Sequence, residues 1–247
     1  ALPICMTLRS IASYSHYMKR EDFPTWDLSL DVAAFMWPAE NPKANLLLQH
    51  GLGEYTTRYL EQYSKLIPTL NSLGFNVYGI DLPGHGFSKG PRGLVDLNQG
   101  VDLHLAAREA IPKDLPLYLF GHSLGGLVTA GSIIREQSGV TAAVLSSSAM
   151  QKPSSLFERV LSKVMAKVAP NGPMPLPRPG LEALSRDPEV VASAASDPLF
   201  YQGKARNLVA KTTLDVSDAV WAHAKDWVVP TLFIHGDKDT STNFENS

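Results

Sequence analysis

The chain has 247 residues, and its 22 Lys and Arg nearly balance its 24 Asp and Glu, which gives a formal net charge of −2 at pH 7. This balance provides no electrostatic reason to expect a nucleic-acid partner. Cys5 is the only cysteine, so no internal disulfide can form, and no apolar run has the length of a membrane span. No signal sequence, metal-ligand spacing or phosphate-binding loop is recognisable. We therefore expect a cytoplasmic α/β enzyme without metal or cofactor, whose oligomeric state is left open.

Apolar strand-like segments and helix-like segments alternate along the first 149 residues. The expected strands are an amphipathic pair at 14–37 and buried strands at 46–49, 76–80, 117–120 and 142–146. The expected helices lie at 59–73, at 102–110 and from residue 124. This alternation predicts a mostly parallel central sheet with helices on both faces. The active site of such a sheet lies beyond the carboxyl ends of its strands.

The alternation stops at about residue 149. A proline-rich stretch between Pro170 and Gly180 interrupts helix-like segments, and the segment 154–169 has apolar residues at helical spacing. We interpret residues 150–217 as a helical cap inserted over the active site. Residues 1–149 and 218–247 would then form the core, with a helix at 217–227 that begins with Ser217 as its N-cap.

A glycine-flanked serine stands between a predicted strand and a predicted helix. The sequence Gly121-His122-Ser123-Leu124-Gly125 fits the pattern G-x-S-x-G. In such a turn the glycines leave room for tight strand-to-helix packing, and the serine hydroxyl is presented beside a helix N-terminus that favours negative charge. The pattern predicts a nucleophilic serine. The alternative is a glycine-rich turn with an incidental serine.

Three further strand ends carry candidate residues. The loop that begins His50-Gly51-Leu52 can aim the Leu52 N–H at a reacting carbonyl oxygen, and the Leu124 N–H would complete an oxyanion hole. An ordinary turn is the alternative for this loop. Asp81 and His85 follow another strand, and we interpret both as structural. The strand at 229–234 ends in acidic sequence, where the acid of a Ser…Asp…His order belongs.

These segments resemble the monoglyceride lipase and lysophospholipase branch of the α/β-hydrolases. The matching segments are HGLGEYTTRY (50–59), DLPGHGFS (81–88), GHSLGG (121–126), SRDPEVV (185–191), DPL (197–199) and VPTLFIHGDKD (229–239). The resemblance implies Ser123 as nucleophile, Leu52 and Leu124 as oxyanion donors, and Asp239 as the acid, with Asp237 ranked second. It implies a monoacylglycerol or lysophospholipid substrate, with a generic short-chain carboxylester as the alternative.

The triad histidine departs from the pattern of that family. All seven histidines precede Asp239, whereas the family's histidine follows the acid after one more strand. His235 and His223 are the least unfavourable substitutes. We expect that a strand, helices and the histidine follow in a longer parent chain, roughly 30 or more residues, and that the 247-residue chain itself has little activity. A non-catalytic protein that binds an acyl lipid or a small ligand is the alternative.

The apolar stripe of the segment 154–169 has two functional interpretations. It can wall an acyl-chain pocket, or it can touch a membrane surface as a peripheral contact. Packing of the cap onto the core is the structural alternative. The candidate pocket residues are His50, Leu156, Phe157, Val160 and Leu161.

Overall fold

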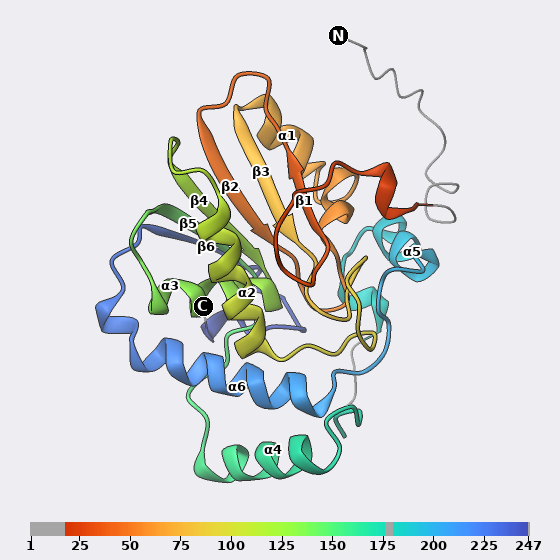
Figure 1. The fold of residues 1–247 in the computed structure, drawn as a ribbon. Helices are drawn as coiled ribbons and strands as arrows, with labels where there is room; N and C mark the ends of the chain where they lie inside the picture. Colours follow the sequence, from red (N-terminus) through yellow and green to blue (C-terminus); the bar gives the residue numbers. More distant parts are fainter. Residues whose placement is uncertain (1–17, 176–179, 247) are drawn as a thin grey trace.

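The computed structural model describes residues 18–175 and 180–246. Within these residues, six strands form one sheet in the order β1-β3-β2-β4-β5-β6 (Figure 1). The strands are β1 (Ala34–Trp37), β2 (Ala44–Gln49), β3 (Phe75–Ile80), β4 (Leu117–His122), β5 (Val140–Ser146) and β6 (Thr231–Ile234). Only β1 is antiparallel to its neighbour, and the other four pairings are parallel. The mostly parallel sheet predicted from the sequence is confirmed.

Helices cover both faces of the sheet because side chains along each strand alternate between them. On β2, Leu46 and Leu48 face the cluster that contains Ile67 of α1 (Leu66–Ser72). Leu47 between them faces the cluster that holds residues of α2 (Leu97–Ala110) and α3 (Leu124–Arg135). The central strand β2 is therefore buried on both faces, as its continuous apolar sequence predicts.

Two elements near the N-terminus are shorter than expected. Of the amphipathic pair at 14–37, residues 14–17 lie outside the described residues, and β1 is the part that forms a strand, bridged once by Thr25. The helix expected at 59–73 is divided into a 3₁₀ turn, Thr56–Leu60, and α1. The division falls at three consecutive residues with positive φ, Tyr63, Ser64 and Lys65 (55°, 56° and 54°), a conformation that a right-handed helix cannot contain.

The chain between β5 and β6 forms α4 (Leu156–Val168), the short η4 (Leu181–Ala183), α5 (Pro188–Ser196) and α6 (Asn207–Ala222). Our expectation that a helix begins at Ser217 is wrong. Ser217 is buried in the middle of α6, where its hydroxyl accepts a hydrogen bond from the Gln151 N–H at 3.1 Å. The boundary at 217 thus falls inside a helix, and the division into core and cap stays a prediction.

The last strand, β6, is the edge of the sheet among the described residues. Its side chains Leu232, Phe233 and Ile234 are exposed. None of the helices in residues 18–175 and 180–246 combines the length and the apolar character that crossing a bilayer requires.

Candidate active site

Ser123 occupies a strained turn between β4 and α3. Its backbone has φ 52° and ψ −120°, a conformation that residues with a side chain rarely adopt. Backbone hydrogen bonds join it to β5 and the residues that follow: the Ser123 N–H donates to the Ser146 carbonyl at 2.9 Å, and the Ser123 carbonyl accepts from the Ala149 N–H at 2.9 Å. The end of β5 therefore fixes the serine at the carboxyl edge of the sheet.

The two flanking glycines are required by packing. A Cβ atom at Gly121 would lie 2.5 Å from the Gly125 carbonyl oxygen. A Cβ atom at Gly125 would lie 2.3 Å from the Gln49 carbonyl oxygen at the end of β2. Either contact is shorter than real Cβ atoms tolerate, so this turn needs glycine at both positions.

Two backbone amides are free beside the serine. Among the described residues, neither the Leu52 N–H nor the Leu124 N–H has a hydrogen-bond acceptor. The loop that carries Leu52 runs close to the serine, because a Cβ atom at Gly51 would lie 3.1 Å from the Ser123 Cβ. The Leu124 amide stands at the first turn of α3. Free N–H donors in such positions can stabilise a developing oxyanion.

A buried carboxylate holds the Leu52 loop in place. The Glu54 carboxylate accepts hydrogen bonds from the Gly51 N–H at 3.2 Å, from the Tyr59 hydroxyl at 3.1 Å and from the Tyr63 hydroxyl. Burial alone would raise the pKa of Glu54, but the nearby His122 and Arg58 and the Tyr63 hydrogen bond together hold it below its usual value. Glu54 is therefore a buried anion with compensating partners.

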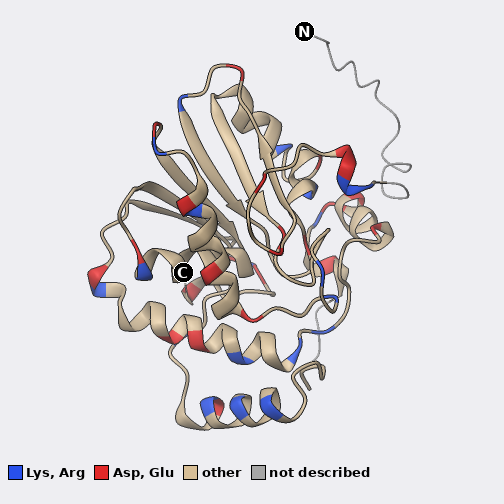
Figure 2. Cartoon of the chain, viewed as in Figure 1, with Lys and Arg blue, Asp and Glu red and all other residues tan. Residues whose placement is uncertain are grey.

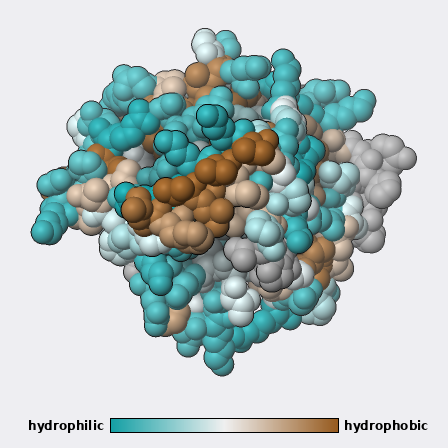
Figure 3. Space-filling view, turned by 90° about the horizontal axis from the view of Figure 1, so that it is seen from below, coloured by the Kyte–Doolittle hydropathy of each residue, from teal (hydrophilic) through white to brown (hydrophobic). Residues whose placement is uncertain are grey.

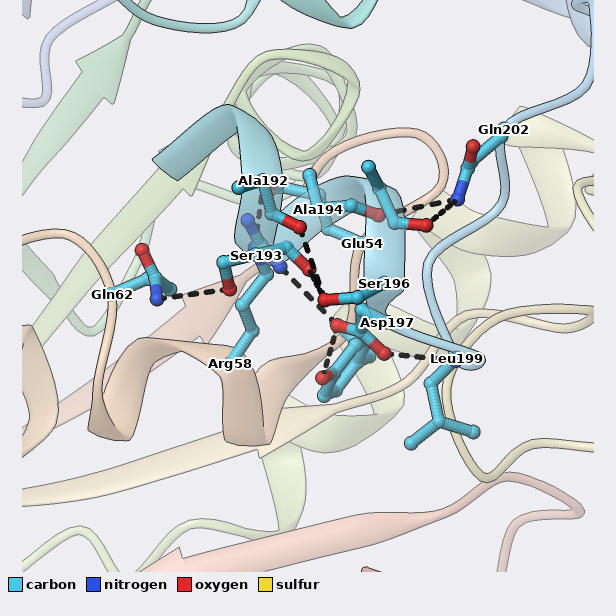
Figure 4. A network of polar contacts seen from close by, with 12 residues as sticks. Glu54, Arg58, Gln62, Ala192, Ser193, Ala194, Ser196, Asp197, Leu199 and Gln202 are labelled. Carbon is cyan, nitrogen blue, oxygen red and sulfur yellow. Dashed lines mark hydrogen bonds and ion pairs between the residues drawn. The ribbon is translucent and has the colours of Figure 1, made fainter. Parts of the chain in front are cut away.

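Arg58 connects Glu54 to the segment that follows α5 (Figure 4). Its Nη1 lies 3.2 Å from Asp197 Oδ2, and its Nε lies 3.9 Å from Glu54 Oε1. The Tyr55 hydroxyl donates to the same Asp197 oxygen at 2.6 Å. Sequence reasoning did not assign Glu54, Arg58 or Asp197 to the site. The i, i+4 spacing of Glu54 and Arg58 could have indicated an ion pair between them. Their third partner, Asp197, lies 139 residues after Arg58, so no local pattern points to it.

The acidic loop after β6 orders Asp239 and leaves Asp237 in solvent. Asp239 accepts hydrogen bonds from the Ser241 N–H at 2.7 Å, the Thr242 N–H at 2.9 Å and the Thr242 hydroxyl at 2.8 Å. Burial would raise the pKa of Asp239, but these hydrogen bonds outweigh burial and lower it. Asp237 is exposed and has no polar partner among the described residues.

A cleft of about 540 Å³ opens beside Ser123. Its apolar lining includes Leu52, Leu184, Val190 and Phe200, but most of its side chains are polar. The polar and charged lining residues are Glu54, Arg58, Glu61, Gln62, Tyr63, Ser64, His122, Ser123, Ser185, Asp187 and Glu189. The space next to the serine therefore suits a group that makes hydrogen bonds.

The comparisons with known proteins identify the family. Residues 40–247 match the profile of the family described as serine aminopeptidase, S33, which covers most of the chain. The chain belongs to this family. It is 31% identical over 210 residues to a monoacylglycerol lipase of Mycolicibacterium smegmatis, covering 82% of this chain and 72% of the relative. The human monoglyceride lipase is 29% identical over 217 residues, covering 82% of this chain and 67% of the relative.

A solved structure of the same kind matches the S33 chain in three dimensions. The crystal structure of a monoacylglycerol lipase from Paleococcus ferrophilus superimposes with a TM-score of 0.72 at 29% identity. The match covers 88% of this chain and 82% of that one. The α/β-hydrolase fold and the monoglyceride lipase resemblance inferred from the sequence are confirmed.

Most histidines of this S33 chain have structural partners. His50 is buried, its Nε2 accepts from the Leu82 N–H at 3.0 Å and its Nδ1 pairs with the Gly51 carbonyl at 2.8 Å, so it does not line the cleft. His85 is also buried, and burial lowers its pKa to about 3. Asp81, expected to be structural, accepts hydrogen bonds from the backbone N–H groups of Thr56 and Phe87.

The remaining candidate bases do not reach the Ser123 hydroxyl. His235 Nε2 lies 3.4 Å from Asp239 Oδ2, and His223 pairs with Asp226 on the surface at 3.5 Å. His122 lines the cleft, but its Nδ1 lies 3.3 Å from the Ser146 hydroxyl. In the described part of the chain, no histidine makes a hydrogen bond to the Ser123 hydroxyl. His235 is therefore paired with Asp239, but no described histidine is paired with Ser123.

The apolar stripe and the cleft are separate in this structure. Leu156 and Phe157 of α4 are 79% and 73% exposed, and Val160 and Leu161 beside them are exposed as well. None of these four side chains lines the cleft beside Ser123. In residues 18–175 and 180–246, no group of three or more His, Cys, Asp or Glu side chains is arranged to hold a metal ion.

Proposed function

We propose that this protein hydrolyses monoacylglycerol-type lipid esters through an acyl-enzyme formed on Ser123. One observation carries the proposal: a serine in a strained turn faces a cleft and lies beside two unpaired backbone N–H groups. The names of the relatives, monoacylglycerol and monoglyceride lipases, support the choice of substrate.

We infer the reaction from this arrangement together with the family resemblance. The Ser123 oxygen attacks the ester carbonyl while a histidine takes its proton, and the Leu52 and Leu124 amides stabilise the oxyanion. The histidine then protonates the departing alcohol, and water releases the fatty acid from the serine in a second round. Asp239 is held ionised, so it can orient the histidine and stabilise its charged form. Each oxyanion donor contributes about 3 kcal/mol to the transition state.

The base in this scheme is a histidine, as the family resemblance implies. A non-catalytic lipid-binding protein is the second candidate, and one observation favours it: no described histidine makes a hydrogen bond to Ser123. The ordered Asp239 carboxylate and the unpaired amides favour the enzyme, because binding alone requires neither.

We further propose that α4 contacts lipid surfaces. A continuous apolar stripe covers this helix when the molecule is seen from below (Figure 3), and its exposed members are Leu156, Phe157, Val160, Leu161, Val164 and Val168. Arg159, Lys163 and Lys167 lie along the same helix (Figure 2). A helix with an apolar face and basic residues binds the interface of anionic membranes.

The experiment that tests the function is hydrolysis of a monoacylglycerol by the natural full-length protein and by its Ser123→Ala variant. We expect turnover by the first and a loss of several orders of magnitude in the second. If the full-length protein is inert on monoacylglycerols and on short esters yet binds them, the lipid-binding alternative replaces the enzyme.

A further inference from the structure

The charges around the cleft are unevenly distributed. Among its described lining residues, four carboxylates stand against a single permanent cation, Arg58. The carboxylates belong to Glu54, Glu61, Asp187 and Glu189. The charge of a group that enters this cleft therefore affects how well it binds.

Arg58 is engaged and cannot receive an anionic ligand. Its side chain is 4% exposed, and it lies between Glu54 and Asp197 at 3.9 Å and 3.2 Å. The Phe200 ring covers its guanidinium at 4.9 Å from the ring centre. Withdrawing Arg58 toward a phosphate would leave two buried carboxylates without their partner, which is costly.

Two of the acidic residues that line the cleft have no cationic partner among the described residues. Glu61 has Lys65 within 3.9 Å, but no described cation forms an ion pair with Asp187 or Glu189. Asp187 is held in place as the N-cap of α5, because its side chain accepts a hydrogen bond from the Glu189 N–H at 2.9 Å. The negative charge at this wall of the cleft is thus anchored to a helix.

We infer that Asp187 and Glu189 determine specificity by disfavouring anionic alcohol groups and accepting uncharged polyol groups. A glycerol-like group donates hydroxyl hydrogen bonds to carboxylates, whereas a phosphate ester meets like charge and finds no free cation among the described lining residues. This inference rests on the proposed function for its placement of the alcohol group in the cleft. The inference therefore predicts that neutral acylglycerols are preferred over acylglycerol phosphates. The sequence resemblance alone does not distinguish these two kinds of substrate.

Binding of two matched ethers tests the inference without any need for turnover. The ligands are a short 1-O-alkylglycerol and its 3-phosphate, titrated calorimetrically into the natural full-length protein at low salt. We expect the neutral ether to bind about tenfold more tightly. The ratio should fall toward one in 0.5 M salt, because exposed charges are screened within a few ångströms at such ionic strength.

The double variant Asp187→Asn/Glu189→Gln should also lower the ratio of the affinities for the neutral ether and its phosphate. Asn at position 187 preserves the N-cap of α5. The control Asp27→Asn/Glu40→Gln removes the same charge from exposed positions that do not line the cleft and should leave the ratio unchanged. Equal or tighter binding of the phosphate, binding of neither ether, or a ratio that the double variant does not alter would overturn the inference. Selective binding without ester hydrolysis would instead contradict the proposed function alone.

Discussion

At the scale of single residues, the strained turn at Ser123 was predictable from the sequence, and the buried residues that support it were not. Gly121, Ser123 and Gly125 lie within five residues, so local sterics reveal their roles. Glu54 and Asp197 are carboxylates that Arg58 joins across 139 residues of sequence. Such a pairing depends on how α5 packs on the core, and no local pattern encodes that packing.

The steric role of Gly125 gives a direct prediction. Gly125→Ala places a methyl group 2.3 Å from the Gln49 carbonyl oxygen and 2.4 Å from that of His50, so the strand or the turn must shift. We expect a loss of about 3 kcal/mol in the free energy of unfolding, measured by urea denaturation. Gly236→Ala is the matched control, since a Cβ atom there meets nothing within 4 Å. Equal stability of the two variants would show that the turn tolerates a side chain.

At the scale of elements, the apolar spacing of the sequence predicted α4 but did not predict where α6 begins. The apolar spacing of 154–169 places α4 well, and its N-terminus has a capping box between Ser155 and Glu158. α6 begins after Arg206, which has no side-chain cap, whereas Ser217 has the residue type of a cap but lies within the helix. Tertiary packing therefore overrides the capping signal at Ser217.

The stripe on α4 predicts how the protein meets lipid. Leu156→Ser/Phe157→Ser removes two highly exposed large side chains at the N-terminal end of α4. We expect at least tenfold weaker binding to vesicles that contain anionic lipid, in co-sedimentation, with unchanged hydrolysis of a short soluble ester. Leu73→Ser/Val228→Ser, which removes exposed apolar side chains outside α4, should leave vesicle binding intact. If both double variants bind alike, α4 is not the contact.

At the scale of the whole molecule, the order of motifs was sufficient to predict the sheet. Strand-like segments that alternate with helix-like segments predict parallel strands, because a helix between two strands returns the chain to the same end of the sheet in one preferred, right-handed way. The polar character of the cleft was not predictable, since α5 and the turn at Tyr63–Lys65 enter it from separate parts of the chain. Exposure of the α4 stripe likewise depends on which face of the helix packs on α6.

Buried histidines make the stability of the whole fold sensitive to pH. Burial, with a smaller effect of Arg108, lowers the pKa of His104 to about 3, and neither ring nitrogen has a hydrogen-bond partner among the described residues. An unfolded histidine titrates near 6.5. Between these values the unfolded chain binds a proton that the folded chain does not, so stability falls as pH falls from about 6.5 toward 3.

His104→Leu removes this imidazole, so the variant should lose less stability than the wild type as the pH falls. We compare the free energy of unfolding of the variant with that of the wild type, by urea denaturation at pH 5 and pH 7. The difference between the two proteins should be about 2 kcal/mol more favourable to the variant at pH 5 than at pH 7. His223→Gln, at an exposed histidine, should follow the wild-type profile. Parallel profiles for His104→Leu and the wild type would mean that His104 titrates normally in the folded protein.

The central claim is that Ser123 is the nucleophile, and covalent labelling tests it most directly. The natural full-length protein is treated with a fluorophosphonate, and the modified peptide is identified by mass spectrometry. We predict a single adduct on Ser123, no adduct in Ser123→Ala, and loss of hydrolysis in step with labelling. Labelling of another residue, or hydrolysis that survives in Ser123→Ala, would contradict the account.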